Sequence, residues 1–426
     1  MIFMNIIDNA IALIQHNKTE EALEILSSEA KKADEQEQLD IAQIYIELGL
    51  IDRAEVLLTK IIGNNPSQSE AKIMLAEIYT DEQKEDKAIS LLNEISEADP
   101  YYLQSLLQLA DVYQVQGLNE VALTKLLEAK NIEPNEPLID LALGELTFSL
   151  GDYQRASIYF QKLINDLDFS DDKNVISKLA ESYALTGEFE RSLQYYEQLD
   201  SDHPEVVFRY GFVAYQLERY ELAVSIWEKL KEKELEYSSL YPYLTDAYEQ
   251  TGQIELAFQT IEEGIQVDSL NKELYLIAAK LALKLNDLKK AINYAQQSIA
   301  LDNEYEDAIS FLLEAYKQDG DHSAIIDLLT KQVDVTVLNG LFEWELAKIL
   351  VEEEMFDQAL KHYRNAYNKL KYDSEFLKEY GYFLMEEGRK DEAITVLRSY
   401  IQLEPADFSV AEYLQRIIED DDLTIL

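Results

Sequence analysis

The residues of this chain that could bind calcium lie in one acidic segment. Asp166, Asp168 and Ser170 match the first three ligand positions of an EF-hand loop. The pattern then fails, because Asp171 stands where that loop needs glycine and Ser177 where it needs a bidentate glutamate. We therefore interpret the segment as a solvated loop between helices.

The remaining candidates for chemistry are equally isolated. No two of the four histidines have the spacing of metal ligands: His16, His203, His322 and His362. Ser201 and Asp202 adjoin one of them, but adjacency in the chain is not the geometry of a catalytic triad. The chain has no cysteine, and neither a Walker loop nor a dinucleotide-binding glycine motif occurs. We predict a protein without enzymatic activity, metal or cofactor.

Charge and hydropathy restrict the classes of partner. The 426 residues carry 37 Lys and Arg against 83 Asp and Glu, a formal net charge of -46, yet 47% of residues are hydrophobic. A large core is therefore expected, and nucleic acid is disfavoured because phosphate binding needs a basic surface. No apolar run approaches the ~20 residues that span a bilayer. The first residues have no basic segment or cleavage site of a signal peptide, so we expect a cytoplasmic protein without direct membrane insertion.

The elements that carry these residues follow an internal repeat. One position, which is alanine in ten of its twelve occurrences, recurs at intervals of 34 residues in eight of eleven cases, the other intervals being 32, 36 and 31. Its twelve occurrences are Ala22, Ala54, Ala88, Ala122, Ala156, Ser192, Ala223, Ala257, Ala291, Ile325, Ala359 and Ala393. Such a period predicts paired helices that stack, since one pair alone cannot bury both of its faces.

A second position, twelve residues before the first, is alanine or glycine in ten of twelve cases. Its residues are Ala10, Ala42, Ala76, Ala110, Gly144, Ala180, Gly211, Thr245, Ala279, Leu313, Ala347 and Gly381. Small residues on both helices of a pair allow their axes to approach closely. Between the two lies a turn, where seven of the 13 glycines share one position and predict a left-handed helix end: Gly49, Gly117, Gly151, Gly187, Gly252, Gly320 and Gly388.

This pattern resembles the tetratricopeptide repeat (TPR) family over about residues 3 to 407. The matching positions in two successive repeats are Leu75, Ala76, Tyr79, Ala88, Leu92 and Pro100, then Leu109, Ala110, Tyr113, Gly117, Ala122, Leu126, Ala129 and Pro134. The family's early tryptophan is absent from every repeat. The resemblance implies an all-α, right-handed superhelical solenoid of about twelve helix-turn-helix repeats plus a C-terminal capping helix.

The repeats suggest three segments of one continuous solenoid. Residues 1–170 hold repeats 1–5, residues 171–405 hold repeats 6–12, and 406–426 form a capping helix and an acidic tail from Asp420 onward. The irregular intervals fall near 166–206. They indicate either a change of superhelical pitch or a tolerated loop insertion, because loops accept changes of length at little cost.

We call the two recurring positions the first-helix landmark (Ala10 to Gly381) and the second-helix landmark (Ala22 to Ala393). In TPR proteins the first helix of each repeat lines a concave groove, and the resemblance implies that the residue directly after the first-helix landmark is central to this groove. Repeats 3 to 6 then place four carboxylates in succession: Glu77, Asp111, Glu145 and Glu181. Such a stripe would attract a basic or amphipathic peptide. The alternative is that a chain with 83 acids shows acids wherever it is exposed.

Later repeats differ in character. Phe208, Phe212 and Tyr215 form one helical stripe in repeat 7, the composition of a binding hot spot, although packing between repeats is the alternative. The groove positions of repeats 8 and 9 are Asp246 and Lys280. Repeats 11 and 12 contribute a mixed aromatic and basic surface: Trp344, Lys348 and Tyr382.

These features favour an interaction protein. We expect a scaffold or adaptor that holds a peptide segment or partner protein in its groove. The lysine pairs of the family's carboxylate clamp, which holds Hsp70- and Hsp90-type C-termini, are missing, with Ile73 and Glu77 at one such pair of positions. Alternatives are a regulator that responds to a peptide and an assembly factor that docks onto a membrane complex.

Overall fold

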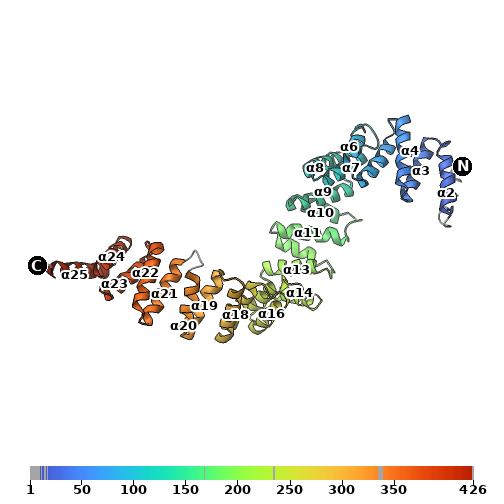
Figure 1. Ribbon diagram of the computed structural model, residues 1–426. Helices are drawn as coiled ribbons and strands as arrows, with labels where there is room; N and C mark the ends of the chain where they lie inside the picture. The colour runs from blue at the N-terminus through green and yellow to red at the C-terminus, as the bar shows by residue number, and fades with distance from the viewer. Residues whose placement is uncertain are drawn as a thin grey trace. The chain divides into compact units, whose positions relative to one another are not determined.

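The chain is described here from a computed structural model, in which residues 10, 12–13, 16, 18–166, 168–233, 236–333 and 339–424 are placed. In these residues the structure contains 24 α-helices and no strand (Figure 1). Contacts between Cα atoms divide the chain into two compact units, Met1–Asp202 and His203–Leu426.

The first unit consists of helix pairs in chain order. The pairs are α3 (Glu35–Glu47) with α4 (Ile51–Asn64), α5 (Ser69–Asp81) with α6 (Glu85–Leu92), α7 (Tyr102–Val115) with α8 (Asn119–Ile132), α9 (Pro137–Ser149) with α10 (Tyr153–Ile164), and α11 (Lys173–Leu185) with α12 (Phe189–Tyr196). They follow α2 (Thr19–Glu29), the second helix of repeat 1. Of the first helix of that repeat, Ala10, Ala12 and Leu13 are described, and its groove position Ile11 lies outside the described residues.

The second unit continues the same pairing. Its pairs are α13 (Pro204–Gln216) with α14 (Tyr220–Lys233), α15 (Leu240–Gln250) with α16 (Ile254–Val267), α17 (Lys272–Lys284) with α18 (Leu288–Leu301), α19 (Glu306–Asp319) with α20 (His322–Val333), α21 (Asn339–Glu352) with α22 (Phe356–Leu370), and α23 (Ser374–Glu386) with α24 (Lys390–Leu403). The helix α25 (Phe408–Thr424) ends the unit. The predicted all-α arrangement of paired helices is confirmed in the described residues.

The boundary between the two units falls at residues 202 and 203, within the segment of irregular repeat intervals. The boundary expected at residue 170 lies between α10 and α11, which contact each other within the first unit. A change of superhelical pitch in this segment stays a prediction.

Both landmark positions form the contact between the helices of a pair. Every one of the twelve second-helix landmark residues is completely buried, including Ser192 and Ile325. Where the first-helix landmark is glycine, a large side chain of the second helix occupies the space. A Cβ built at Gly211 would lie 2.2 Å from Nε1 of Trp227, and one at Gly381 would lie 2.5 Å from Cδ2 of Leu397. The small residues are therefore required for close packing, as predicted.

The turns within the repeats share one backbone conformation. All seven glycines of the predicted turn position have φ between 70° and 80°, which confirms the left-handed helix end. The same position in the remaining described turns is also left-handed but is occupied by other residues: Gln83, Glu218, Asn286 and Glu354, with φ of 57° to 60°. Eleven successive turns thus close alike, whichever residue is present.

The capping helix is longer than predicted. α25 continues to Thr424 rather than ending at residue 419, so Asp420–Asp422 belong to the helix. It buries Val410, Leu414 and Ile417, whereas Phe408 at the first helical position is 74% exposed. Of the helices in the described part of the chain, none is both long and apolar enough to cross a membrane.

Candidate functional site

The acidic groove positions of the first unit begin with two uncompensated carboxylates. Glu77 on α5 and Asp111 on α7 are both exposed, and neither has an ion-pair or hydrogen-bond partner among the described residues. Desolvation by the surrounding helices raises the pKa of the Asp111 carboxyl although the residue is exposed. A cationic group placed beside these carboxylates would meet no competing cation of the protein.

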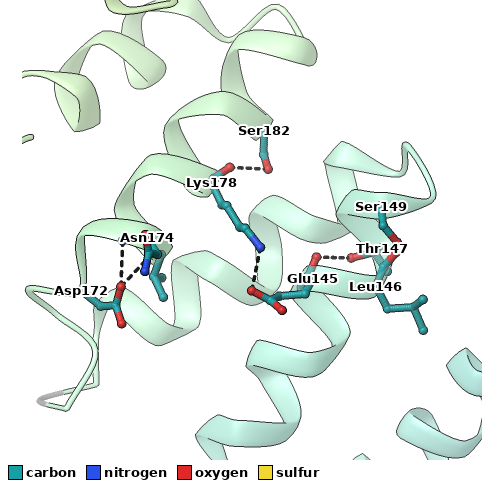
Figure 2. A network of polar contacts seen from close by, with 10 residues as sticks. Glu145, Leu146, Thr147, Ser149, Asp172, Asn174, Lys178 and Ser182 are labelled. Atoms are coloured by element: carbon teal, nitrogen blue, oxygen red, sulfur yellow. Dashed lines mark hydrogen bonds and ion pairs between the residues drawn. The ribbon is translucent and has the colours of Figure 1, made fainter. Parts of the chain in front are cut away.

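The next position of the predicted stripe is compensated. Lys178 on α11 reaches back along the groove face to α9, and its Nζ lies 2.6 Å from Oε1 of Glu145 (Figure 2). The start of α11 is fixed by the carboxylate of Asp172, which accepts hydrogen bonds from the backbone N–H of Asn174 and Val175 at 2.8 and 3.2 Å. Glu181 follows on α11 and is half-buried. The stripe therefore carries its free charge at its first two positions.

The aromatic residues of α13 pack against aromatic residues of the next helices. The ring of Phe208 lies 5.9 Å from that of Trp227 and 5.3 Å from that of Tyr237, centroid to centroid. Phe212 contacts Tyr243 edge to face at 5.5 Å. Phe208 and Phe212 are half-buried in this cluster, so they join repeats 7 and 8 and leave part of each ring exposed. Their binding role stays a prediction.

Tyr215 connects the same stripe to the groove position of repeat 8. Its hydroxyl donates a hydrogen bond to Oδ2 of Asp246, and Nε2 of Gln250 lies 3.4 Å from Oδ1 of that carboxylate. Burial and the bond to this carboxylate raise the pKa of the Tyr215 hydroxyl. Both oxygens of Asp246 therefore have donors from the protein itself.

Asp246 and Lys280 line one cavity of the second unit. Its volume is about 610 Å³. Helix α15 contributes Pro242, Thr245, Asp246 and Glu249, α17 contributes Ile277, Lys280, Leu283 and Lys284, and α19 contributes Phe311. All three are first helices of their repeats, so the cavity lies on the face that the resemblance assigns to the groove.

The charges in this cavity are unequally compensated. Lys284 forms an ion pair with Glu249. Lys280 is exposed and has no ion-pair or hydrogen-bond partner in the described part of the chain. Asp246 keeps its negative charge, because its two hydrogen-bond donors, Tyr215 and Gln250, are neutral. Its oxygens already have donors, however, whereas the ammonium of Lys280 has no acceptor among the described residues and is free to bind an anion.

Trp344, predicted in repeat 11, belongs to a hydrogen-bonded group around Glu379, whereas Lys348 of the same repeat forms an ion pair with Glu345. Nε1 of Trp344 donates to Oε1 of Glu379 at 2.8 Å, and the hydroxyl of Tyr363 donates to the same oxygen at 2.6 Å. The ammonium of Lys348 lies 4.7 Å from the centroid of the Trp344 ring. Lys348 and Tyr382 also line a smaller cavity of about 360 Å³. These three predicted residues thus share one region of the second unit.

Sequence reasoning missed several residues of these sites. Glu379 and Tyr363 were not predicted, although an acceptor for the Trp344 N–H could have been expected. Ile277 lies three residues before Lys280 on the same helical face, which helical periodicity would have indicated. Thr245 was visible as a departure from the small residues at its position.

The described residues contain no group of three or more His, Cys, Asp or Glu that could hold a metal ion. Two histidines pair with carboxylates instead. Nδ1 of His322 lies 2.7 Å from Oε1 of Glu353, and Nδ1 of His362 lies 2.5 Å from Oε2 of Glu343.

Comparison with known proteins supports the class of the fold. Models of tetratricopeptide repeats match residues 45–110, 175–206 and 272–305. Among solved structures, the TPR protein YrrB matches 43% of this chain and 96% of its own at 13% identity and a TM-score of 0.39. A TPR protein from Parabacteroides merdae matches 58% and 98%, at 16% identity and a TM-score of 0.39. These two similarities are too low to bear on function.

Two further family models, built for a narrower group of TPR proteins, also match the chain. "YpiA-like, tetratricopeptide repeats" matches residues 114–166, and "YpiA-like, C-terminal tetratricopeptide repeats" matches residues 341–407. The TPR repeat-containing protein YpiA of Bacillus subtilis is 37% identical over 418 residues, which cover 98% of this chain and 99% of that protein. The chain belongs to the YpiA-like family of tetratricopeptide repeat proteins. TPR proteins mediate interactions between proteins, and this chain has their fold.

Proposed function

We propose that this protein is a non-enzymatic scaffold or adaptor that binds a peptide segment or partner protein on the face formed by the first helices of its repeats. The observation that carries the proposal is the cavity between α15, α17 and α19, in which two predicted groove residues, Asp246 and Lys280, lie together. A cavity with apolar walls and a few charged groups is suited to hold a side chain of a bound segment.

The exposed carboxylates of the first unit support the same proposal. Glu77 and Asp111 leave two charges of the groove face without a partner among the described residues. As long as no other molecule is bound, these two carboxylates form no ion pair with the described residues that would stabilise the fold. They can strengthen association with a basic segment of the partner.

The test is affinity capture with charge-reversed variants of the whole chain. The double variant Glu77→Lys and Asp111→Lys should lose or weaken a partner that the unaltered chain retains, and capture should decrease at high salt because exposed charges are screened. The matched control is Asp86→Lys with Glu120→Lys. These residues are exposed acids on the second helices α6 and α8, so the change of net charge is identical. Equal loss of the partner in both variants would contradict groove binding.

A further inference from the structure

We infer that the cavity between α15, α17 and α19 binds an acidic and apolar peptide segment, in which a leucine- or phenylalanine-like side chain lies next to a carboxylate. The inference rests on the proposed function and adds the chemistry of the segment. It differs from the basic segment expected at the acidic stripe of the first unit, because Lys280, a cation of this cavity, has neither an ion-pair nor a hydrogen-bond partner among the described residues.

The hydroxyl of Thr245 is the first observation. Thr245 is 1% exposed and lines the cavity, and its Oγ1 has no hydrogen-bond partner. Threonines elsewhere in these helices donate to the carbonyl four residues earlier. Thr80 donates to Ala76 at 2.9 Å, and Thr251 donates to Ala247 at 3.0 Å. A buried polar group without a partner is costly, so a ligand group that reaches this hydroxyl from the cavity would gain a hydrogen bond that the protein alone does not form.

A threonine at position 245 is unusual among the repeats. The corresponding residue is alanine or glycine in ten of the twelve repeats, and in repeat 8 it is threonine. Alanine would fill the contact between the helices without adding a polar atom. The hydroxyl is therefore an addition at the wall of the cavity that the packing of the helices does not require.

The charge of Lys280 is the second observation. Its ammonium has no partner in the described residues, while the neighbouring acids are occupied: Asp246 by Tyr215 and Glu249 by Lys284. The chain as a whole has a net charge of -46 and repels anions, but a lysine without a partner in the described part of the chain attracts them to this cavity. A carboxylate of the peptide would compensate it.

The apolar residues that line the cavity favour a peptide with an apolar side chain. Pro242, Ile277, Leu283 and Phe311 are half-buried and face the same space. With about 610 Å³ available, the cavity has room for a large aliphatic or aromatic side chain. Burial of that side chain gives affinity, and the pairing of the carboxylate with Lys280 gives the preference for acidic neighbours.

The inference is tested by selecting random dodecapeptides on the immobilised full-length chain by mRNA display. Peptides with Asp or Glu beside Leu, Ile or Phe should be enriched, and their affinity is then measured by fluorescence polarisation. Lys280→Glu should weaken them about fivefold or more, the range of a partly exposed ion pair that becomes a like-charge contact. Lys280→Arg should preserve binding. The control Lys289→Glu lies on the second helix α18, is exposed and does not line the cavity.

Thr245→Ala tests the hydroxyl separately. It restores the residue of the other repeats, so the variant should fold, and it should weaken the selected peptides about threefold through the loss of one hydrogen bond. Selected peptides that lack acids, or that bind Lys280→Glu as well as the unaltered chain, would overturn the inference and leave groove binding intact. Failure to select any peptide would overturn the inference too, while capture of a partner by the acidic stripe would still support the proposed function.

Discussion

The hydroxyl of Tyr215 donates a hydrogen bond to Oδ2 of Asp246, across 31 residues of sequence and between the first helices of two successive repeats. The bond joins the aromatic stripe of α13 to the cavity of α15, α17 and α19. Asp246 keeps its charge, because the tyrosine donor is neutral, whereas Lys280 has neither an ion-pair nor a hydrogen-bond partner among the described residues. The same contact therefore serves the packing between repeats and the hydrogen bonding of a cavity residue.

This bond should contribute measurably to stability. Replacing Tyr215 by Phe, Asp246 by Asn, and both together forms a double-mutant cycle, and we expect a coupling of about 1 kcal/mol in the free energy of unfolding. Urea denaturation followed by circular dichroism provides the four values. A coupling indistinguishable from zero would show that the bond does not connect the repeats energetically.

Alkaline pH should destabilise the protein through its tyrosines. Several donate to carboxylates of neighbouring helices, as Tyr237 does to Glu205 and Tyr294 to Glu262. Burial and its bond to Glu205 raise the pKa of Tyr237 to about 12. A raised pKa in the folded state means that the contribution to stability is complete below the unfolded value near 10 and is lost as pH rises through the folded value.

The free energy of unfolding should therefore fall between about pH 10 and pH 12, at constant ionic strength. Urea titrations at graded pH measure it, and Tyr237→Phe should make the decrease smaller because that residue no longer titrates. An equal decrease in both proteins would exclude Tyr237 as a source.

The left-handed turns predict opposite effects for two substitutions. Glu354→Gly should stabilise the protein by up to about 1 kcal/mol, because a non-glycine residue in this conformation costs about 1–2 kcal/mol, partly offset by the greater freedom of glycine in the unfolded chain. Gly187→Ala should destabilise it by about 1 kcal/mol. A Cβ at Gly187 meets nothing within 4 Å, so the backbone alone sets this cost. Thermal denaturation that shows the same sign for both variants would contradict this explanation.

The contact of Gly211 with Trp227 predicts a steric effect with a rescue. Gly211→Ala would place a Cβ against the indole and should destabilise the protein by about 1–3 kcal/mol, although alanine normally favours a helix interior. Leucine occupies the position of Trp227 in other repeats, such as Leu92 and Leu126. Trp227→Leu should therefore remove most of the penalty of Gly211→Ala, and additive losses in the double variant would contradict the steric explanation.

The fold could be predicted from the sequence because the residues that determine it recur with a regular period. Gly117 and Ala122 recur with their spacing in repeat after repeat, and each type has one physical reason: a left-handed turn or a close helix contact. The turns at Gln83 and Glu218 have the same conformation without glycine. At these two turns the packing of the two flanking helices sets the backbone conformation, and the residue at the turn position does not indicate it.

The candidate sites were less predictable because they depend on contacts between repeats. Glu145 was correctly placed on a first helix, but the ion pair with Lys178 that compensates it joins residues from successive repeats. Asp246 and Lys280 were assigned to the groove one by one, whereas the cavity that they share needs Phe311 of a third helix. Side-chain conformation decides such contacts, and the repeat pattern does not contain it.

Site-specific photo-crosslinking in the organism that encodes the chain tests groove binding most directly. A photoreactive phenylalanine is placed at Glu77 or Lys280 on the first helices, and at Asp86 or Lys289 on the second helices. All four residues are exposed, so their reach into solvent is comparable. We predict covalent adducts with a partner protein from the first-helix positions and none from the second-helix positions, as identified by mass spectrometry. Adducts confined to Asp86 and Lys289 would contradict the account.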